Sequence, residues 1–407
     1  MWRAVLPIFS NRNLSILLAT GFIAGFSSLP NQAHAASCGG KLSTFLQGVK
    51  KEAIAEGISK KAADTALRNA QISRKVLSRD RAQGVFKQTF LQFSKRSVSQ
   101  NRLDHGAKNL RKYASTFKRA EQEFGVPAPV IAAFWGLETD FGAFQGDFNT
   151  MNALVTLAHD CRRPELFRPQ LISAIKMVEM GDLSPSKMTG AWAGEIGQVQ
   201  MLPEDIVRYG TDGDGDGRVN LKKSSPDAIL TAAAFIQSLG WKRNQPWIME
   251  ITLPGGAFPY EKSGLRKGMT TGDWANLGVT ARNGSLPSAS LPADLLLPQG
   301  RKGPAFLAFP NFDIYLEWNK SFIYTTSAAY FATRLGGAKR YNAGNPDQGL
   351  SDAQMKQLQN NLVSRGYDVG KIDGILGSKT RAAVQAEQLR LGMPADAWPT
   401  PSLLNKL

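Results

Sequence analysis

Apolar residues recur at spacings of three and four through the first part of the chain. The spacing is seen in a stretch that runs from residue 41 to about 124, which begins with Leu42, Phe45, Leu46 and Val49. The period is typical of amphipathic helices, and few strand signals interrupt it. The stretch is therefore predicted to be helical.

The middle of the chain divides into apolar helical segments and one irregular region. Residues 127–159 are apolar and Ala-rich, begin with prolines suited to a helix start, and break at Gly142 and Gly146. Further helices are predicted at 169–180, 227–239 and 322–335. Residues 249–310 are rich in Gly, Pro and Ser with short β-like runs, which indicates a small loop-rich or β insertion. The predicted fold class is mainly α.

A polar, Gly-containing stretch without periodicity separates a small C-terminal module from the rest. We predict a domain at 36–340, a linker at 341–350 and a small three-helix domain at 351–407. Within the module, helices are predicted at 352–365 and 379–391, followed by a Pro-rich tail. The expected core residues are Leu358, Leu362, Val384 and Leu389, with Gly366, Gly374 and Gly377 in turns.

The first 35 residues are typical of a cleavable export signal. Arg3 and Arg12 give a basic start, residues 14–29 are largely apolar, and Ala33-His34-Ala35 is a small-residue cleavage site. The apolar run is shorter than the roughly 20 residues that a membrane helix needs, so a transmembrane segment is the less favoured alternative. The mature protein is expected to begin near Ala36 and to reside in the periplasm.

The net charge indicates the kind of polymer that the protein binds, and the cysteine content indicates a disulfide. The formal net charge of +16 falls to +14 without Arg3 and Arg12, yet no basic-aromatic recognition motif or dense Lys/Arg tract is present. An anionic cell-wall polymer therefore explains the basic surface better than nucleic acid. In an oxidising compartment the two cysteines, Cys38 and Cys161, are expected to form a structural disulfide. The alternative is a lipid anchor on Cys38, in the sequence AASC, which would make the protein an outer-membrane lipoprotein and bring it to the membrane.

The segment FWGLETDFG contains the strongest candidate for acid chemistry. Glu138 lies at the end of an otherwise apolar helix, flanked by Trp135, Leu137 and Phe141. Such surroundings favour the protonated form of a carboxyl, which can then give its proton to a glycosidic oxygen. The alternative, for a Glu in an arbitrary helix, is a solvated surface position.

A second segment, GAWAGEIGQVQMLP, is Gly-rich and presents two glutamines. Gln198 and Gln200 offer amide donors and acceptors of the kind that bind sugar hydroxyls. The alternative is a pair of solvated side chains on an ordinary Gly-rich turn.

These segments, together with LEWNKSFIY, resemble in order the B-type membrane-bound lytic transglycosylases over about residues 38–337. The resemblance implies a lysozyme-like helical domain in which Glu138 is the catalytic residue and Gln200 lines the sugar cleft. It also places Trp318, Asn319, Ser321 and Tyr324 at the substrate.

The chemistry implied by the resemblance needs one carboxyl and no catalytic cofactor. Glu138 protonates the leaving oxygen of the MurNAc-GlcNAc β-1,4 bond and then takes the proton of the MurNAc 6-hydroxyl as a 1,6-anhydro ring closes. The alternatives are a lysozyme-type muramidase and a non-catalytic peptidoglycan-binding scaffold. Asp140 and Asp147 are expected to be structural.

The chain departs from the family pattern on the expected cleft rim. Glu195 stands where a small apolar residue is usual, and Met201-Leu202-Pro203-Glu204 replaces aromatic-Met-Pro-Ser. Glu195 could tune Glu138 or face solvent, and we expect it to face solvent.

An Asp-rich loop, DGDGDGRVNLKK, follows and matches the first half of an EF-hand loop. Asp212, Asp214 and Asp216 occupy its positions 1, 3 and 5, but Lys223 replaces the bidentate Glu at position 12. The resemblance supplies Asp227, at the start of the next helix, as the closing ligand, with the Arg218 carbonyl and Asn220 through water. A structural Ca²⁺ is expected here, the alternative being an empty Asp-Gly turn.

The C-terminal module resembles a peptidoglycan-binding domain of the three-helix type, although Glu387 replaces a usual core aromatic residue. The partners expected for the whole chain are peptidoglycan strands and other cell-wall enzymes.

Overall fold

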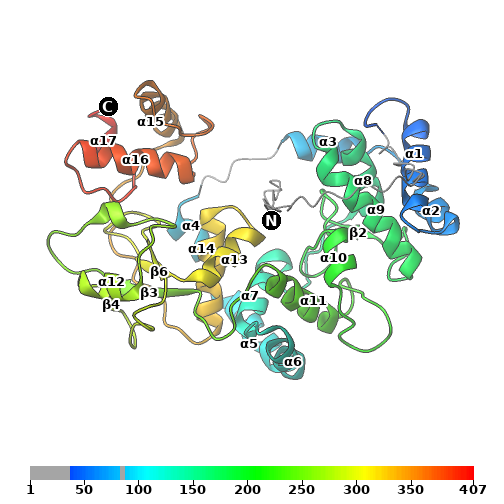
Figure 1. Cartoon of the computed structure of the whole chain (residues 1–407), viewed down its shortest axis with the longest axis horizontal. Coiled ribbons are helices and arrows are strands. Elements are labelled where there is room, and N and C mark those ends of the chain that lie inside the picture. The colour runs from blue at the N-terminus through cyan, green and yellow to red at the C-terminus, as the bar shows by residue number, and fades with distance from the viewer. Residues whose placement is uncertain (1–36, 83–87) are drawn as a thin grey trace, which may run out of the picture.

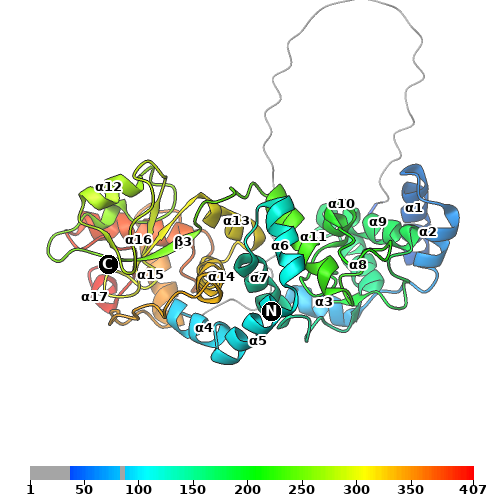
Figure 2. The ribbon, with the colours of Figure 1, turned by 90° about the horizontal axis from the view of Figure 1, so that it is seen from below.

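The computed structural model describes residues 37–82 and 88–407 and is mainly helical with a small four-stranded sheet, which confirms the predicted fold class. The predicted export signal lies outside the described residues. Figures 1 and 2 show an elongated molecule, with α1, α2, α8 and α9 at one end and the sheet with α15 to α17 at the other. Within the described part of the chain, no helix is both long and apolar enough to cross a membrane.

The larger part of the molecule, called here the helical body, is built from helices that come before and after the insertion. Its helices are α1 (Leu42–Ala55), α2 (Lys60–Leu67), α3 (Arg74–Arg81), α4 (Phe90–Ser97), α5 (Gln100–Lys112), α6 (Ala114–Phe124), α7 (Ala128–Thr139), α8 (Thr150–His159), α9 (Pro164–Met180), α10 (Pro203–Tyr209), α11 (Ser225–Ser238), α13 (Pro310–Trp318) and α14 (Phe322–Leu335). A two-stranded antiparallel ribbon, β1 (Phe148–Asn149) and β2 (Thr189–Gly190), lies beside them.

Two of these helices differ from the sequence-based prediction. Helix α9 begins at Pro164, five residues early, and continues through Pro169. Pro169 has no backbone N–H and so removes one hydrogen bond of α9, but the buried residues that follow hold the helix in place. Helix α13 was missed: it is nine residues long and directly follows the irregular region, so the helical spacing of its buried residues covers only about two turns.

Helix α7 is the centre of the helical body. Every residue from Val130 to Thr139 is buried. A helix that is apolar on all sides must be surrounded by other elements, and α7 packs against α5, α6, α11 and α14 (Figure 1). Glu138, in its last turn, is therefore held by the most enclosed element of the fold.

The insertion forms a separate small core. Its strands are β3 (Ile248–Thr252), β4 (Thr280–Ala281), β5 (Asp294–Leu296) and β6 (Phe306–Ala308), with the short helices η1 (Tyr260–Lys262) and α12 (Thr271–Asn276). The antiparallel order is β4-β3-β6-β5. Trp274, Leu295 and Leu307 are fully buried between the sheet and its loops. The insertion therefore has its own hydrophobic centre.

The C-terminal module contains α15 (Asp352–Ser364), α16 (Ser378–Arg390) and α17 (Pro401–Leu404). Leu358, Leu362 and Val384 are buried as predicted, but Leu389 is 57% exposed, so its assignment to the core was wrong. Five residues after Val384, Leu389 lies about 140° around the helix from it. Glu387 takes the inward position.

The buried Glu387 is compensated by polar neighbours. Arg390 and Arg365 pair with its carboxylate, and the Tyr367 hydroxyl donates to it at 3.0 Å. The hydrogen bond from Arg390 is the largest influence that holds the pKa of Glu387 below its usual value. A charge network thus stands where an aromatic residue was expected.

The C-terminal module is docked on the insertion. The Gln385 amide donates to the carbonyls of Ser263 at 3.0 Å and Tyr260 at 3.2 Å and accepts from Lys267 Nζ at 3.0 Å. Residues 341–350 have no regular secondary structure, but Tyr341 is buried and its hydroxyl bonds to Ser94 at 2.7 Å. The segment between the two parts is therefore anchored to the helical body.

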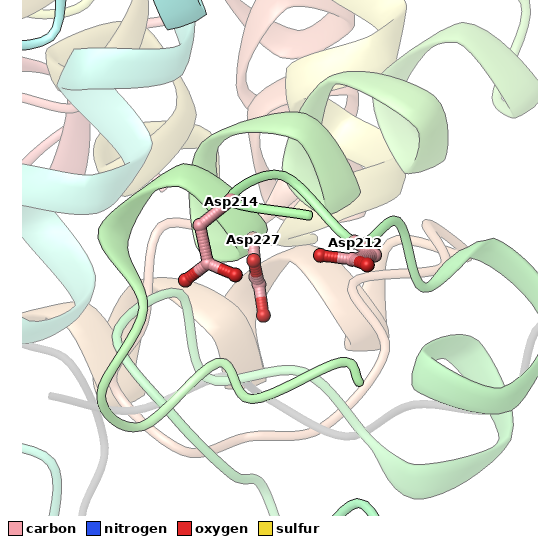
Figure 3. A group of neighbouring side chains, drawn as sticks. All are labelled: Asp212, Asp214 and Asp227. Carbon is pink, nitrogen blue, oxygen red and sulfur yellow. The ribbon is translucent and has the colours of Figure 1, made fainter. Parts of the chain in front are cut away.

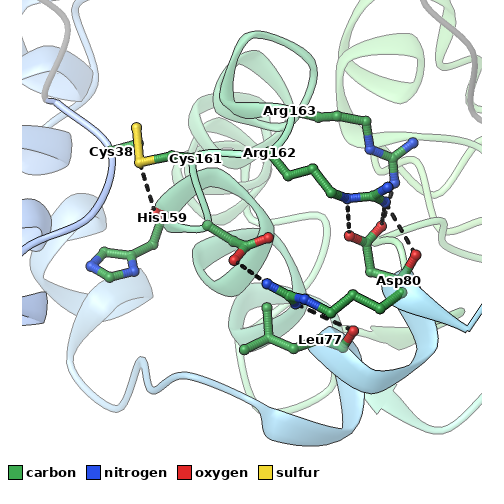
Figure 4. Close-up of polar contacts among 9 residues, drawn as sticks. Cys38, Leu77, Asp80, His159, Cys161, Arg162 and Arg163 are labelled. Atoms are coloured by element: carbon green, nitrogen blue, oxygen red, sulfur yellow. Dashed lines mark hydrogen bonds and ion pairs between the residues drawn. A yellow bond between two sulfur atoms is a disulfide. The ribbon is translucent and has the colours of Figure 1, made fainter.

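At the other end of the molecule, Cys38 and Cys161 are joined in a disulfide, as expected (Figure 4). The bridge closes a loop across 123 residues of sequence. Close to it, the carboxylate of Asp80, 2% exposed, is paired with Arg162 and Arg163, the two residues that follow Cys161. The turn after α8 is thus fixed both to the segment that precedes α1 and to α3.

Candidate active site

Glu138 is a buried carboxyl with two aromatic hydrogen-bond donors. It is 5% exposed, and its Oε1 accepts from Trp318 Nε1 and from the Tyr324 hydroxyl, both at 2.7 Å. The donors come from the end of α13 and the first turn of α14, about 180 residues further along the chain. The packing of α7 against α14 brings these groups together.

The indole of Trp318 is held by aromatic packing. Its ring lies on the Phe134 ring, with centroids 4.2 Å apart and planes at 25°, and Phe235 meets it edge-on at 5.6 Å. Such stacking restricts the rotation of the indole and keeps its N–H directed at Glu138. The donor is therefore positioned by the fold.

Asn319 and Ser321 form the turn between the two donors. Asn319 Oδ1 accepts from the Ser321 backbone N–H at 2.9 Å, and the Asn319 carbonyl accepts from Thr325 Oγ1 at 2.7 Å. Ser321 Oγ caps α14 by accepting from the Tyr324 N–H. These bonds orient Trp318 and Tyr324 around Glu138.

The glutamine loop lies against the catalytic helix. The Thr139 hydroxyl, next to Glu138, donates to the Gln198 carbonyl, and Gln198 Oε1 accepts from Ser225 Oγ at 3.2 Å. Gln200 has φ 50° and donates from its amide to the carbonyls of Gly197 and Gln145. Both glutamines are buried and hold the loop in place. Sequence reasoning missed Thr139, although it lies inside GLETDFG.

The expectation that Glu195 faces solvent is wrong. It is 6% exposed, because β-bridges that pair Ile196 with Gly190 and with Met201 fold this loop inward. The Glu195 carbonyl accepts from the Ala191 N–H at 2.9 Å. A side chain at Gly190 would place its Cβ 1.8 Å from that carbonyl oxygen, so only glycine fits. Met201 is also buried and is not on the rim.

Asp140 and Asp147 engage other groups. Asp140 ends α7 with φ 50° and accepts from Arg102 Nε at 2.6 Å. The Asp147 side chain is 84% exposed and lies 3.9 Å from Lys75 Nζ. This arrangement agrees with structural roles for both.

The Asp-rich loop brings three carboxylates together. One oxygen each from Asp212, Asp214 and Asp227 lies within 4.8 Å of the others (Figure 3). Asp227 is fully buried and accepts from the N–H groups of Gly213 at 2.9 Å and Asn220 at 2.7 Å. An all-oxygen donor set of this kind fits a hard cation such as Ca²⁺.

One expected carboxylate ligand, that of Asp216, does not join the group of three. Asp216 Oδ1 accepts from the Arg218 N–H at 2.9 Å, and Asp216 is outside the group. Asp212 accepts from the N–H groups of Gly217 and Gly215, and the bond from Gly217 is the main reason that the pKa of Asp212 is lowered.

Comparison with known proteins shows two matched families and several similar structures. Residues 41–333 match the Transglycosylase SLT domain, and residues 351–407 match a Putative peptidoglycan binding domain. The chain is similar to SltB3 from Pseudomonas aeruginosa in complex with NAG-anhNAM-pentapeptide, at 35% identity and a TM-score of 0.82, covering 90% of this chain and 99% of that one.

Two relatives from Escherichia coli are more distant. Membrane-bound lytic murein transglycosylase B of strain K12 is 28% identical over 235 residues, which is 57% of this chain and 63% of that relative's length. The lytic transglycosylase Slt35, solved in complex with calcium, shares the fold at 23% identity and a TM-score of 0.60, covering 75% of this chain and 97% of that one.

Proposed function

We propose, from the premise that this chain belongs to the SLT-domain family of lytic murein transglycosylases, that it cleaves the MurNAc-GlcNAc β-1,4 bond of peptidoglycan and leaves 1,6-anhydro-MurNAc ends. The observation that carries the proposal is the buried carboxyl of Glu138 with two donors on one of its oxygens. Analysis of the products by mass spectrometry tests it.

The geometry assigns different tasks to the two oxygens of Glu138. Both donor bonds go to Oε1, so Oε2 is left to carry the acid proton. Oε2 gives this proton to the glycosidic oxygen as the bond to MurNAc C1 breaks. The substrate's acetamido group stabilises the positive charge that develops at C1.

The second step returns the proton to Glu138. Trp318 and Tyr324 stabilise the carboxylate left by the first transfer, because hydrogen bonds to an ionised acceptor are stronger than those to a neutral one. The carboxylate then takes the proton of the MurNAc 6-hydroxyl while that oxygen attacks C1 and closes the anhydro ring. No water is consumed, which distinguishes this reaction from that of a muramidase.

Removing one donor should slow the chemical step. We expect Tyr324→Phe, or Trp318→Phe, to lower kcat about 10- to 100-fold with little change in KM, because a hydrogen bond to a charged group contributes about 1.5–3 kcal/mol. Tyr330→Phe, on the same helix, is the matched control and should stay within about twofold. Equal losses for Tyr324→Phe and Tyr330→Phe would contradict a specific role for the Tyr324 hydroxyl.

A Ca²⁺ would be held by Asp212, Asp214 and Asp227. The ion would stabilise the folded state because it neutralises the repulsion among the three carboxylates. With Lys223 in place of a bidentate Glu, we expect a Kd of roughly 10⁻⁴ to 10⁻³ M. Ten-millimolar calcium, about 10 to 100 times that Kd, should then stabilise the fold by about 1.4–2.7 kcal/mol.

Thermal unfolding of the full chain with and without calcium measures this gain. Asp214→Asn should abolish the calcium response, whereas Asp147→Asn, an exposed acid outside the group, should retain it. A wild-type melting curve that calcium does not move would show that the loop binds no ion under these conditions.

We propose peptidoglycan as the partner of the whole chain and the periplasm as its location. SltB3 was crystallised with peptidoglycan fragments, and the C-terminal module matches a peptidoglycan-binding family. Because the sulfur of Cys38 is in a disulfide, it is not available for a lipid anchor. This supports a periplasmic protein over an outer-membrane lipoprotein.

A non-catalytic scaffold is the alternative from another class. The departures from the family pattern at Glu195 and Met201 favour this alternative only if they alter the rim of the cleft. Both residues are buried. The retained Glu138 with its two donors favours an enzyme.

A further inference from the structure

Lys222 lies between the Asp-rich loop and α11, on the segment that supports the proposed sugar-binding loop. The carbonyl of the preceding residue, Leu221, accepts from the Gln198 N–H at 2.9 Å. The carbonyl of Lys222 itself accepts from Gln145 Nε2 at 3.0 Å. The backbone of Lys222 is therefore bonded to the turn that follows Glu138, and its neighbour to the glutamine loop.

The ammonium of Lys222 is partly buried and has only neutral oxygens as partners among the described residues. It donates to the carbonyl of Thr189 at 2.7 Å and to its hydroxyl at 2.6 Å. No described carboxylate forms an ion pair with it. An ammonium has three N–H donors, so one remains after the two bonds to Thr189.

A cation withdrawn from water without a counter-charge is unfavourable, and buried charges in proteins are usually paired. The neighbouring Lys223 is exposed and has no such constraint. The two bonds to Thr189 fix the ammonium of Lys222 in one place, where its remaining N–H can meet an acceptor on a ligand. An anionic group of the ligand would supply the missing charge.

An exposed aromatic ring lies on the same turn. Phe144 is 70% exposed, and its N–H donates to the carbonyl of Thr139, the residue after Glu138, at 2.9 Å. Gln145, which holds the Lys222 carbonyl, is the next residue. The backbone of Lys222 is thus bonded to a turn that carries the exposed Phe144 ring and begins one residue from the proposed acid.

We propose that Lys222 recognises a carboxylate carried by the glycan strand, with the Phe144 ring as the adjoining apolar contact. The inference rests on the proposed function and specifies its substrate: strands that bear acidic substituents in place of neutral chitin-like chains. In peptidoglycan such a carboxylate comes from the stem peptide or, where the peptide has been removed, from the lactyl group. The lysine acts in binding and takes no part in proton transfer.

The test measures binding by the full chain in the Glu138→Gln background, so that no ligand is consumed. The ligands are glycan strands with stem peptides, the same strands after amidase treatment, and chitin oligosaccharides, which carry no carboxylate. Lys222→Met is compared with Lys222→Arg, which keeps the charge, and with Lys223→Met as the matched control. Thermal unfolding of each variant checks that it is folded, and Lys222→Gln, which keeps a donor for Thr189, repeats the test if the methionine variant is unstable.

We expect Lys222→Met to bind peptide-bearing strands about tenfold or more weakly, since one charge-assisted hydrogen bond is lost. Lys222→Arg should stay within about twofold, and Lys223→Met and all affinities for chitin oligosaccharides should be unchanged. A loss confined to amidase-treated strands would identify the lactyl carboxylate as the source.

An unchanged affinity of the Lys222 variants, or an equal loss on chitin oligosaccharides, would overturn the proposal. An equal loss in Lys223→Met would also overturn it. The wild-type protein is assayed separately for anhydro products. Failure of that assay contradicts the proposed function, whereas a normal result there with unchanged Lys222 variants contradicts only this inference.

Discussion

Replacing Glu138 by glutamine is expected to lower the release of anhydro-muropeptides about 10²- to 10⁴-fold, the range that a general acid/base contributes. The amide has almost the volume of the carboxyl, and its oxygen can still accept from Trp318 and Tyr324, so the fold should be retained. It has no acid proton to give, and it cannot take up the proton of the 6-hydroxyl. Product release from purified sacculi, followed over time, measures the loss.

The matched control is Asp140→Asn, which removes the carboxylate nearest in sequence. Because Asp140 pairs with Arg102, we expect this variant to keep activity within about tenfold. Binding of the Glu138→Gln variant to sacculi should equal that of the wild type. A comparable loss in Asp140→Asn would indicate a pair of carboxylates and contradict the mechanism with one acid.

Loss of the disulfide is expected to have the largest effect on stability. Serine at both Cys38 and Cys161 should lower the free energy of unfolding by about 2–5 kcal/mol, because the bridge restricts an unfolded loop of 123 residues. The bridge also fastens the segment before α1 to the turn after α8, where the Gly39 N–H donates to the His159 carbonyl at 2.8 Å. Denaturant unfolding of the double variant and the wild type measures the difference.

Reducing agent supplies the internal control for this prediction. It should destabilise the wild type to the level of the double serine variant and leave that variant unchanged. A wild-type unfolding curve that reduction does not move, or free thiols in periplasmic protein that was never reduced, would contradict the bridge.

The sequence predicted those parts of the fold that depend on local pattern. Helix α14 was predicted with the bounds that it has, because its ends coincide with a serine cap and a glycine. Helix α13 was missed because its nine residues show helical spacing over only about two turns. Leu389 was misassigned because, five residues after Val384, it lies about 140° around α16 from the buried face.

The candidate site was predictable in part. The apolar surroundings of Glu138 were visible in its own segment, but Trp318 and Tyr324 were reached only through the family resemblance. Their contact depends on α7 packing against α14, which no local pattern encodes. The burial of Glu195 was missed for the same reason, since it follows from β-bridges to residues on either side of its loop. Lys222 was not predicted as a site residue, because the partial burial of its ammonium and its bonds to Thr189 depend on the fold and not on the local sequence.

The most direct test of the central claim is mass spectrometry of the products that the wild-type protein releases from purified sacculi in isotopically labelled water. We predict muropeptides that end in 1,6-anhydro-MurNAc, lighter by one water than their reducing counterparts and free of label, because the 6-hydroxyl of the substrate is the nucleophile. Reducing MurNAc ends that carry the label would show that water attacks C1, and they would contradict transglycosylation in favour of a muramidase.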